Sequence, residues 1–157
     1  MALSEQTCEV DSPEINRSTK EVLERVQRRA VKMVSGLSAT TYQGRLAELG
    51  LLSLEARRTK YDLVQTFKII HGHDRVDRRH WFSLVGSNPT RVTRVTSDPL
   101  NIVRKNSNLD LRRHFFSLRA IEHCNNLDTK IKSAVLVSSF KDKIIPYLKT
   151  LDDRLQL

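Results

Sequence analysis

Four cations recur at helical spacing near the N-terminus and are the residues best suited to bind an anion. Arg25, Arg28, Arg29 and Lys32 lie three and four residues apart, so a helix would carry all four on one face. We call this set the basic stripe. Its like charges repel one another unless an anion lies across them, and arginine forks match phosphate oxygens. The basic stripe therefore indicates either a nucleic-acid contact or a solvated face that neighbouring glutamates partly neutralise.

The same residue types recur along the rest of the chain. Across its 157 residues the formal net charge is +9. This excess favours nucleic acid as the partner, ahead of an anionic membrane surface or no anionic partner at all. We predict that nucleic acid binds through its phosphates, without a membrane. Beyond the basic stripe, the candidate contacts are Arg57 and Arg58 with Lys60, Arg91 and Arg94, and Arg112 and Arg113 with Arg119.

Residues that could support catalysis or bind a metal do not form a recognisable pattern. Asp152 and Asp153 have no supporting context, and the sequence has no phosphate-cradling glycine loop. A zinc site needs about four converging ligands, whereas His114, His123 and Cys124 lack the usual ligand spacing. We therefore predict that the chain has no catalytic residue, metal, cofactor or small-molecule substrate.

The two cysteines and the N-terminal residues bear on the compartment. Cys8 and Cys124 lie far apart and form no CxxC pair, which favours a reducing environment. The first residues lack the features of a signal peptide, and no apolar run reaches membrane-spanning length. We expect an intracellular protein, in the nucleus or the cytoplasm.

The elements that would position the cations are helices. Ser18 and Glu21 have the spacing of a capping box, and Gly36 is placed to end the helix that follows. A short helix is expected over 41–49, and Ser53 should cap another that ends before Gly72. The first helix should bury one apolar row, which consists of Val22, Val26, Ala30, Met33 and Leu37.

Regular spacing breaks between Gly72 and residue 108, and helical spacing then returns. Asp110 can cap a helix to about Asn125, and Ser138 can cap a last helix that Pro146 should kink or end. The sequence thus predicts a mainly α fold, a small helical domain of about five helices with an irregular or extended middle segment. The expected regions are a flexible leader (1–17), a helical region (18–72), an irregular basic linker or arm (73–108) and a C-terminal helical region (109–157).

The order of several short segments resembles a known family. These segments are Leu23-Glu24-Arg25-Val26-Gln27-Arg28-Arg29-Ala30, Lys32-Met33, Gly36-Leu37, Arg45-Leu46, Glu48-Leu49-Gly50-Leu51, Ser53-Leu54-Glu55, Arg57-Arg58, Asp62-Leu63, Phe67-Lys68-Ile69-Ile70, His71-Gly72, Leu109-Asp110, His114-Phe115-Phe116 and Ser138 with Phe140-Lys141. Together they resemble the stretch that follows the polymerase palm in CR1- and Jockey-like LINE, or non-LTR retrotransposon, reverse transcriptases. In those proteins this stretch is a helical thumb followed by a C-terminal tail.

The resemblance implies that the first helix grips a template–primer duplex, next to a polymerase palm in the parent protein. It also implies a parent with RNA-directed DNA polymerase activity, whose catalytic aspartates and endonuclease fall outside this sequence. The chain departs from its relatives at Thr90-Arg91-Val92-Thr93 and at Cys124-Asn125. The resemblance thus makes 18–72 a thumb-like helical region. We predict a non-catalytic nucleic-acid-binding fragment of such a polymerase, which binds RNA or an RNA–DNA hybrid through its phosphates. The alternatives are a helical protein-interaction module or a degenerate fragment with no selected function.

Overall fold

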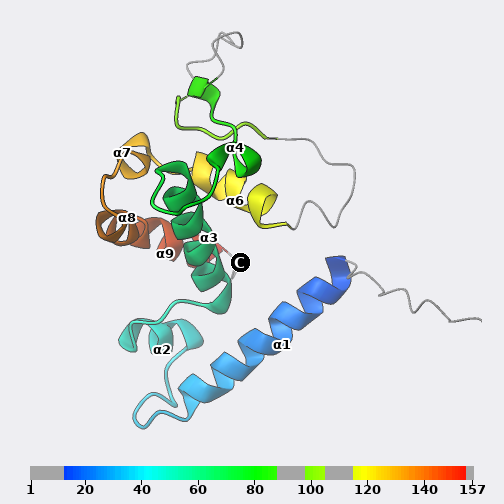
Figure 1. Ribbon diagram of the computed structural model, residues 1–157. Coiled ribbons are helices and arrows are strands. Elements are labelled where there is room, and N and C mark those ends of the chain that lie inside the picture. The colour runs from blue at the N-terminus through cyan, green and yellow to red at the C-terminus, as the bar shows by residue number, and fades with distance from the viewer. Residues whose placement is uncertain (1–12, 88–97, 105–114, 155–157) are drawn as a thin grey trace, which may run out of the picture.

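The structure, a computed structural model, is mainly helical, which confirms the predicted fold class (Figure 1). It describes residues 13–87, 98–104 and 115–154. The elements, in chain order, are α1 (Pro13–Lys32), α2 (Tyr42–Glu48), α3 (Leu54–Ile70), α4 (Arg78–Trp81), the 3-10 turn η1 (Val85–Ser87), α6 (Phe116–Asn125), α7 (Thr129–Lys132), α8 (Val137–Lys143) and α9 (Ile145–Arg154).

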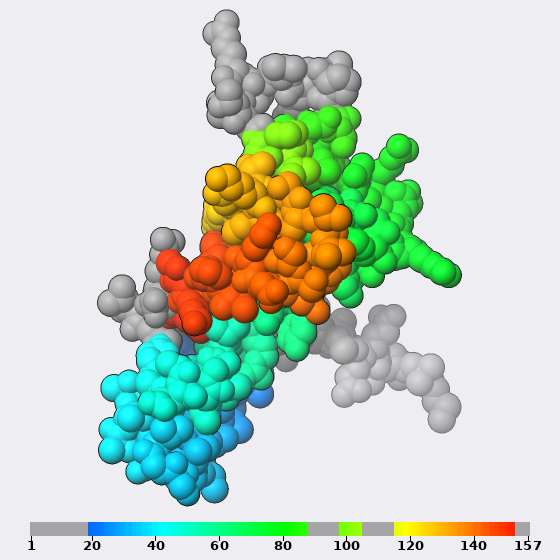
Figure 2. All heavy atoms as spheres, turned by 90° about the vertical axis from the view of Figure 1, so that its left-hand side faces the viewer, coloured from blue at the N-terminus to red at the C-terminus, as the bar shows by residue number. Residues whose placement is uncertain are grey.

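Helix α3 is the centre of the molecule, and α6, α8 and α9 pack around it (Figure 1). Figure 2 shows the C-terminal residues, coloured orange to red, across the middle of one face of the molecule. Leu63 and Phe67 of α3 are buried against Phe140, Ile144 and Leu148 of the C-terminal helices. The Phe67 and Phe140 rings stack with their centroids 4.2 Å apart. The regions 18–72 and 109–157 of the sequence therefore share one hydrophobic core, and α3 belongs to both sides of it.

Parts of the middle segment belong to this core as well. Phe82, Leu84 and Ile102 are buried, and Leu84 and Ile102 form an isolated antiparallel bridge. The Asn125 side chain accepts a hydrogen bond from the Ile102 amide at 2.8 Å and donates one to its carbonyl at 2.9 Å. Apart from α4, η1 and this bridge, the described residues of the segment are irregular, as expected. Around Phe82 and Ile102 they are packed structure and not a free linker or arm.

Capping residues mark both ends of α3. Ser53 caps α3 by accepting from the Ala56 amide at 3.1 Å, and Gly72 follows α3 with a φ of 72°, a conformation that favours glycine. The Asp152 carboxylate of α9 accepts hydrogen bonds from both the amide and the hydroxyl of Ser53. The chain also breaks between α8 and α9, beside Pro146, as its ring predicts.

Two predicted caps are wrong. Helix α1 begins at Pro13, so Ser18 lies within it and the helix extends into the range 1–17 that was expected to be a leader. Proline suits a first turn because its missing N–H would have no helical partner there. Helix α8 begins after Leu136, so Ser138 lies inside that helix and does not cap it. The predicted cap at Asp110 falls outside the described residues.

The face that α1 turns toward the protein is also not the one predicted. Val31 is buried, whereas Val22, Val26 and Met33 of the expected inward row are 50%, 63% and 81% exposed. The helix is attached mainly through polar side chains. Gln27 donates to the Leu52 carbonyl at 3.1 Å, and Glu24 accepts hydrogen bonds from both Tyr42 and the Leu54 amide.

A buried ion pair holds the middle segment against α7. The Lys132 ammonium lies 2.7 Å from the Asp98 carboxylate and 2.7 Å from the Asn101 side-chain oxygen. Burial alone would raise the pKa of Asp98, but hydrogen bonds from Lys132, the Leu100 amide and Thr129 outweigh it and lower that pKa below its usual range. The pair therefore satisfies two charges that are almost fully removed from solvent.

Substitution of Lys132 tests whether its ion pair with Asp98 holds the middle segment against α7. Replacing Lys132 by Met should lower the free energy of unfolding by about 3–5 kcal/mol, because it leaves the Asp98 charge buried without its partner. Lys130→Met, an exposed change on the same short helix, should stay within about 0.5 kcal/mol of the parent. Urea denaturation followed by circular dichroism measures both, and equal stability of the two variants would contradict the assigned role.

The free energy of unfolding, measured as a function of pH, tests the same ion pair in a second way. A carboxyl whose folded pKa is lowered stabilises the protein above its unfolded pKa of about 3.9 and loses that contribution as pH falls through the folded value. The parent should therefore lose stability below about pH 4, and Lys132→Met should show a smaller loss over the same window.

The orientation of α1 gives a separate test. Val26→Asp should change the free energy of unfolding by less than about 0.5 kcal/mol, since Val26 points to solvent. Val31→Asp places the same charge in a buried position and should cost at least about 2 kcal/mol more. Helicity and urea denaturation of the two variants report the difference. A larger loss of stability for Val26→Asp than for Val31→Asp would show that α1 is turned the other way.

Candidate nucleic-acid interface

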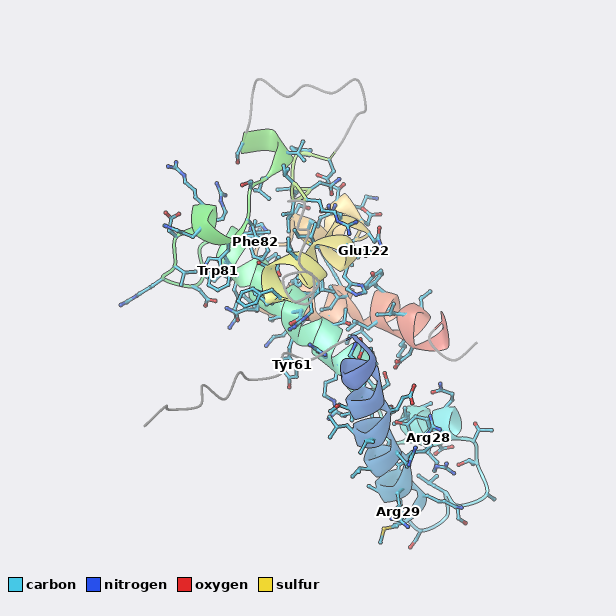
Figure 3. The ribbon with its side chains drawn as sticks, turned by 90° about the vertical axis from the view of Figure 1, so that its right-hand side faces the viewer. Arg28, Arg29, Tyr61, Trp81, Phe82 and Glu122 are labelled. Atoms are coloured by element: carbon cyan, nitrogen blue, oxygen red, sulfur yellow. The ribbon has the colours of Figure 1, made fainter. Side chains whose placement is uncertain are left out.

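The basic stripe lies on an exposed flank of α1. Arg25, Arg28, Arg29 and Lys32 are all exposed, and Figure 3 shows Arg28 and Arg29 projecting from the helix. Among the described residues, no carboxylate lies within ion-pairing distance of any of the four. Their positive charges thus face solvent without a counter-charge from the described part of the chain.

Arg28 differs from the other three cations because it has a partner in the protein. Its guanidinium lies over the Tyr42 ring, 4.8 Å from the ring centroid. Such a cation–π contact is worth about 0.5–1 kcal/mol at an exposed site, and it holds Arg28 toward α2. Arg25, Arg29 and Lys32 are therefore the members of the basic stripe that are available to an external anion.

The hydrogen bonds that Glu24 accepts and Gln27 donates explain why the basic stripe is exposed. The Tyr42 hydroxyl donates to Glu24 at 2.5 Å, and the Leu54 amide donates to the same carboxylate at 3.0 Å. Burial and the Glu24 carboxylate both raise the pKa of Tyr42, so its hydroxyl stays protonated and remains a donor. With Glu24 and Gln27 turned inward, the helical period places the basic stripe on one flank and the apolar row beyond it.

The second predicted cluster is divided between two faces of α3. Arg57 and Lys60 line an open groove with a volume of about 800 Å³. Arg58 lines a different pocket between α1 and α3, together with Glu55 and with Lys20, whose ammonium lies 3.2 Å from Glu55. The surroundings of Arg58 are therefore mixed in charge, whereas Arg57 and Lys60 belong to a mainly cationic surface.

Sequence reasoning missed three residues of the open groove, namely Tyr61, Lys68 and Lys141. The spacing of Arg57, Tyr61 and Lys68 on α3 is a helical signal that could have revealed most of this face. Lys141 comes from α8 and reaches the groove only through tertiary packing. The groove is lined by Gly50, Leu51, Leu52, Arg57, Lys60, Tyr61, Asp62, Val64, Gln65, Lys68, Phe116 and Lys141.

Arg119, a predicted phosphate contact, is engaged inside the protein. Its guanidinium binds both oxygens of Asp62, with nitrogen–oxygen distances of 2.6 and 2.8 Å. These hydrogen bonds raise the pKa of Arg119 further above its ordinary value. The pair joins α3 to α6 and neutralises Asp62, so Arg119 stabilises the fold and is not a free cation. The remaining predicted contacts, Arg91, Arg94, Arg112 and Arg113, lie outside the described residues.

Two of the residues weighed as metal ligands, His123 and Cys124, are neighbours near the end of α6. Among the described residues, no three His, Cys, Asp or Glu side chains converge as a metal site would require. His123 Nδ1 lies 3.1 Å from the Tyr147 hydroxyl, and burial raises the pKa of the Cys124 thiol to about 11. Both features are typical of packed structure. Cys8 and His114 lie outside the described residues.

The described surface thus offers exposed cations for anion binding. No helix within the described part of the chain is both long and apolar enough to cross a bilayer. We compared the chain with protein-family models, with curated proteins and with solved structures. None of the three comparisons found a match.

Proposed function

We propose that this chain is a non-catalytic module that binds the phosphates of RNA or an RNA–DNA hybrid through the basic stripe of α1. The observation that carries the proposal is the exposure of Arg25, Arg29 and Lys32 on one flank, without a carboxylate partner among the described residues. Three unpaired cations on one helix flank repel one another, and a row of phosphates removes that repulsion.

The dimensions of the flank suit a nucleic-acid backbone. Arg25 and Lys32 are seven residues apart, which is about 10 Å along a helix axis. That length spans a few successive phosphates of a nucleic-acid strand. Binding releases the counterions condensed on the nucleic acid, so affinity should be independent of sequence and strongly dependent on salt. The net charge of +9 supports this mode by raising the rate of encounter.

The resemblance to LINE reverse transcriptases supports the same proposal. In such a parent, α1 and α3 would belong to the thumb, and the polymerase palm would be the neighbouring domain. The chain would then act as a fragment derived from an RNA-directed DNA polymerase, holding nucleic acid without extending it. This origin rests on the order of the motifs in the sequence.

One prediction concerns catalysis. The purified chain should not extend a DNA primer on an RNA template, with either magnesium or manganese, because two-metal catalysis needs converging carboxylates and no cluster of three metal-ligating side chains occurs among the described residues. Incorporation of labelled nucleotides is the measurement. Incorporation above that of a heat-denatured sample would overturn the non-catalytic part of the proposal.

A further prediction concerns the basic stripe. Replacing Arg25, Arg29 and Lys32 together by Gln should weaken binding to an RNA–DNA hybrid. It should also reduce the slope of log affinity against log salt by about 0.7–0.9 for each phosphate that the variant no longer neutralises. Glutamine keeps a good helix propensity, and all three positions are exposed. Fluorescence anisotropy at several salt concentrations measures both quantities.

A matched control separates local contacts from net charge. Replacing Arg75, Arg79 and Lys130 by Gln also removes two arginines and one lysine at exposed positions, and lowers the net charge from +9 by three to +6 in the same way. This control should keep most of the parent's affinity and salt slope. If both triple variants lose affinity equally, net charge and not the basic stripe accounts for binding.

A second candidate function follows from the exposed apolar row of α1. Val22, Leu23, Val26 and Met33 are each at least half exposed and lie beside the basic stripe. An apolar helix face can dock against an amphipathic partner helix, and acidic residues on that partner would complement the basic stripe. Salt dependence distinguishes the candidates, since phosphate binding weakens steeply with salt and an apolar interface does not.

A further inference from the structure

The open groove on α3 combines cations with an accessible aromatic ring. Lys60 and Lys68 approach it from α3 and Lys141 from α8, so cations border it on two sides. Tyr61 lies between the two α3 lysines in sequence and is 69% exposed, and Figure 3 shows its side chain projecting from α3. A tyrosine ring that is this exposed contributes little to the hydrophobic core, and its face is available to stack against a ligand.

The acidic residue of the groove does not oppose an anion. Asp62 lies next to Tyr61, but the Arg119 guanidinium binds both of its oxygens and cancels its charge. Among the described residues, no carboxylate lies within 4 Å of the ammonium of Lys60, Lys68 or Lys141. The groove therefore presents net positive charge around an exposed ring, above a floor that includes the buried Val64.

We propose that this groove binds a short stretch of single-stranded nucleic acid, with a base stacked on Tyr61 and the adjacent phosphates on Lys60, Lys68 and Lys141. This inference rests on the proposed nucleic-acid function and adds a second site that differs from the basic stripe in what it recognises. Stacking platforms set within cationic grooves are the general means of holding single strands without sequence preference.

The chemistry of the groove favours a single strand over a duplex. Bases in a duplex are stacked on one another and cannot present a face to Tyr61, whereas an unpaired base can. Arg57 and Lys68 are eleven residues apart, about 16 Å along the axis of α3, which gives room for a short run of strand. An acidic peptide would satisfy the lysines but would leave the tyrosine ring without a stacking partner.

The test compares two substitutions at Tyr61 and two nucleic acids. Tyr61→Phe keeps the ring and removes the hydroxyl, and Tyr61→Ala removes the ring. Because the side chain is exposed, neither should disturb the core, which circular dichroism checks. Affinity is measured by fluorescence anisotropy for a labelled ten-nucleotide thymidine DNA strand and for an RNA–DNA hybrid of equal length.

We expect Tyr61→Ala to weaken binding of the single strand by about tenfold, within the range that one stacked base contributes. Tyr61→Phe should bind as the parent does, and both variants should bind the hybrid as the parent does. Inorganic polyphosphate, which has no bases, should bind equally to all three proteins. Replacing Lys60, Lys68 and Lys141 by Gln should weaken both the single strand and polyphosphate.

Three results would overturn the inference: equal single-strand affinity of Tyr61→Ala and the parent, an equal decrease in Tyr61→Phe, or a decrease for polyphosphate that matches the decrease for the strand. The hybrid measured in parallel separates this failure from failure of the proposed function. If the parent binds the hybrid through α1 but Tyr61→Ala leaves single-strand affinity unchanged, only the groove assignment is wrong. If the parent binds neither nucleic acid, both assignments are wrong.

Discussion

Glu24 attaches α1 to the rest of the molecule. The hydrogen bonds that Glu24 accepts determine which surfaces of α1 are exposed. The Glu24 carboxylate accepts hydrogen bonds from the Tyr42 hydroxyl and the Leu54 amide. Gln27, one turn further along α1, donates a hydrogen bond to the Leu52 carbonyl. Because these side chains face inward, the cations and the apolar row of α1 both face solvent. A polar attachment of this kind sets which faces of a helix are exposed without burying its hydrophobic side.

The sequence predicts the helices well where local chemistry decides them. Ser53 at the start of α3 and Gly72 after it act within one turn of the chain, so their effects can be inferred from neighbouring residues. The orientation of α1 could not be inferred in this way. Helical periodicity shows that an apolar row exists, but only the tertiary contacts of Glu24 and Gln27 show that the row is exposed.

The candidate site also contains some residues that local sequence predicts and others that only tertiary contacts explain. The basic stripe follows from spacing within one helix and can be found from sequence. Arg119 also belongs to a basic cluster in sequence, yet the Asp62 carboxylate, 57 positions away, engages it. The buried positions of Phe82 and Ile102 likewise depend on partners distant in sequence. Residue type and local spacing indicate which side chains can bind an anion, but long-range contacts determine which of them are free to do so.

The cap of α3 has a consequence for how the chain acquires its structure during synthesis. The Asp152 carboxylate that binds Ser53 lies 99 positions further along the chain, and Leu148 of the same helix completes the core around α3. A ribosome releases α3 long before it releases α9. The central helix therefore emerges with its apolar face uncovered, and it can pack fully only after nearly all of the described chain has been made, at about 5–20 residues per second.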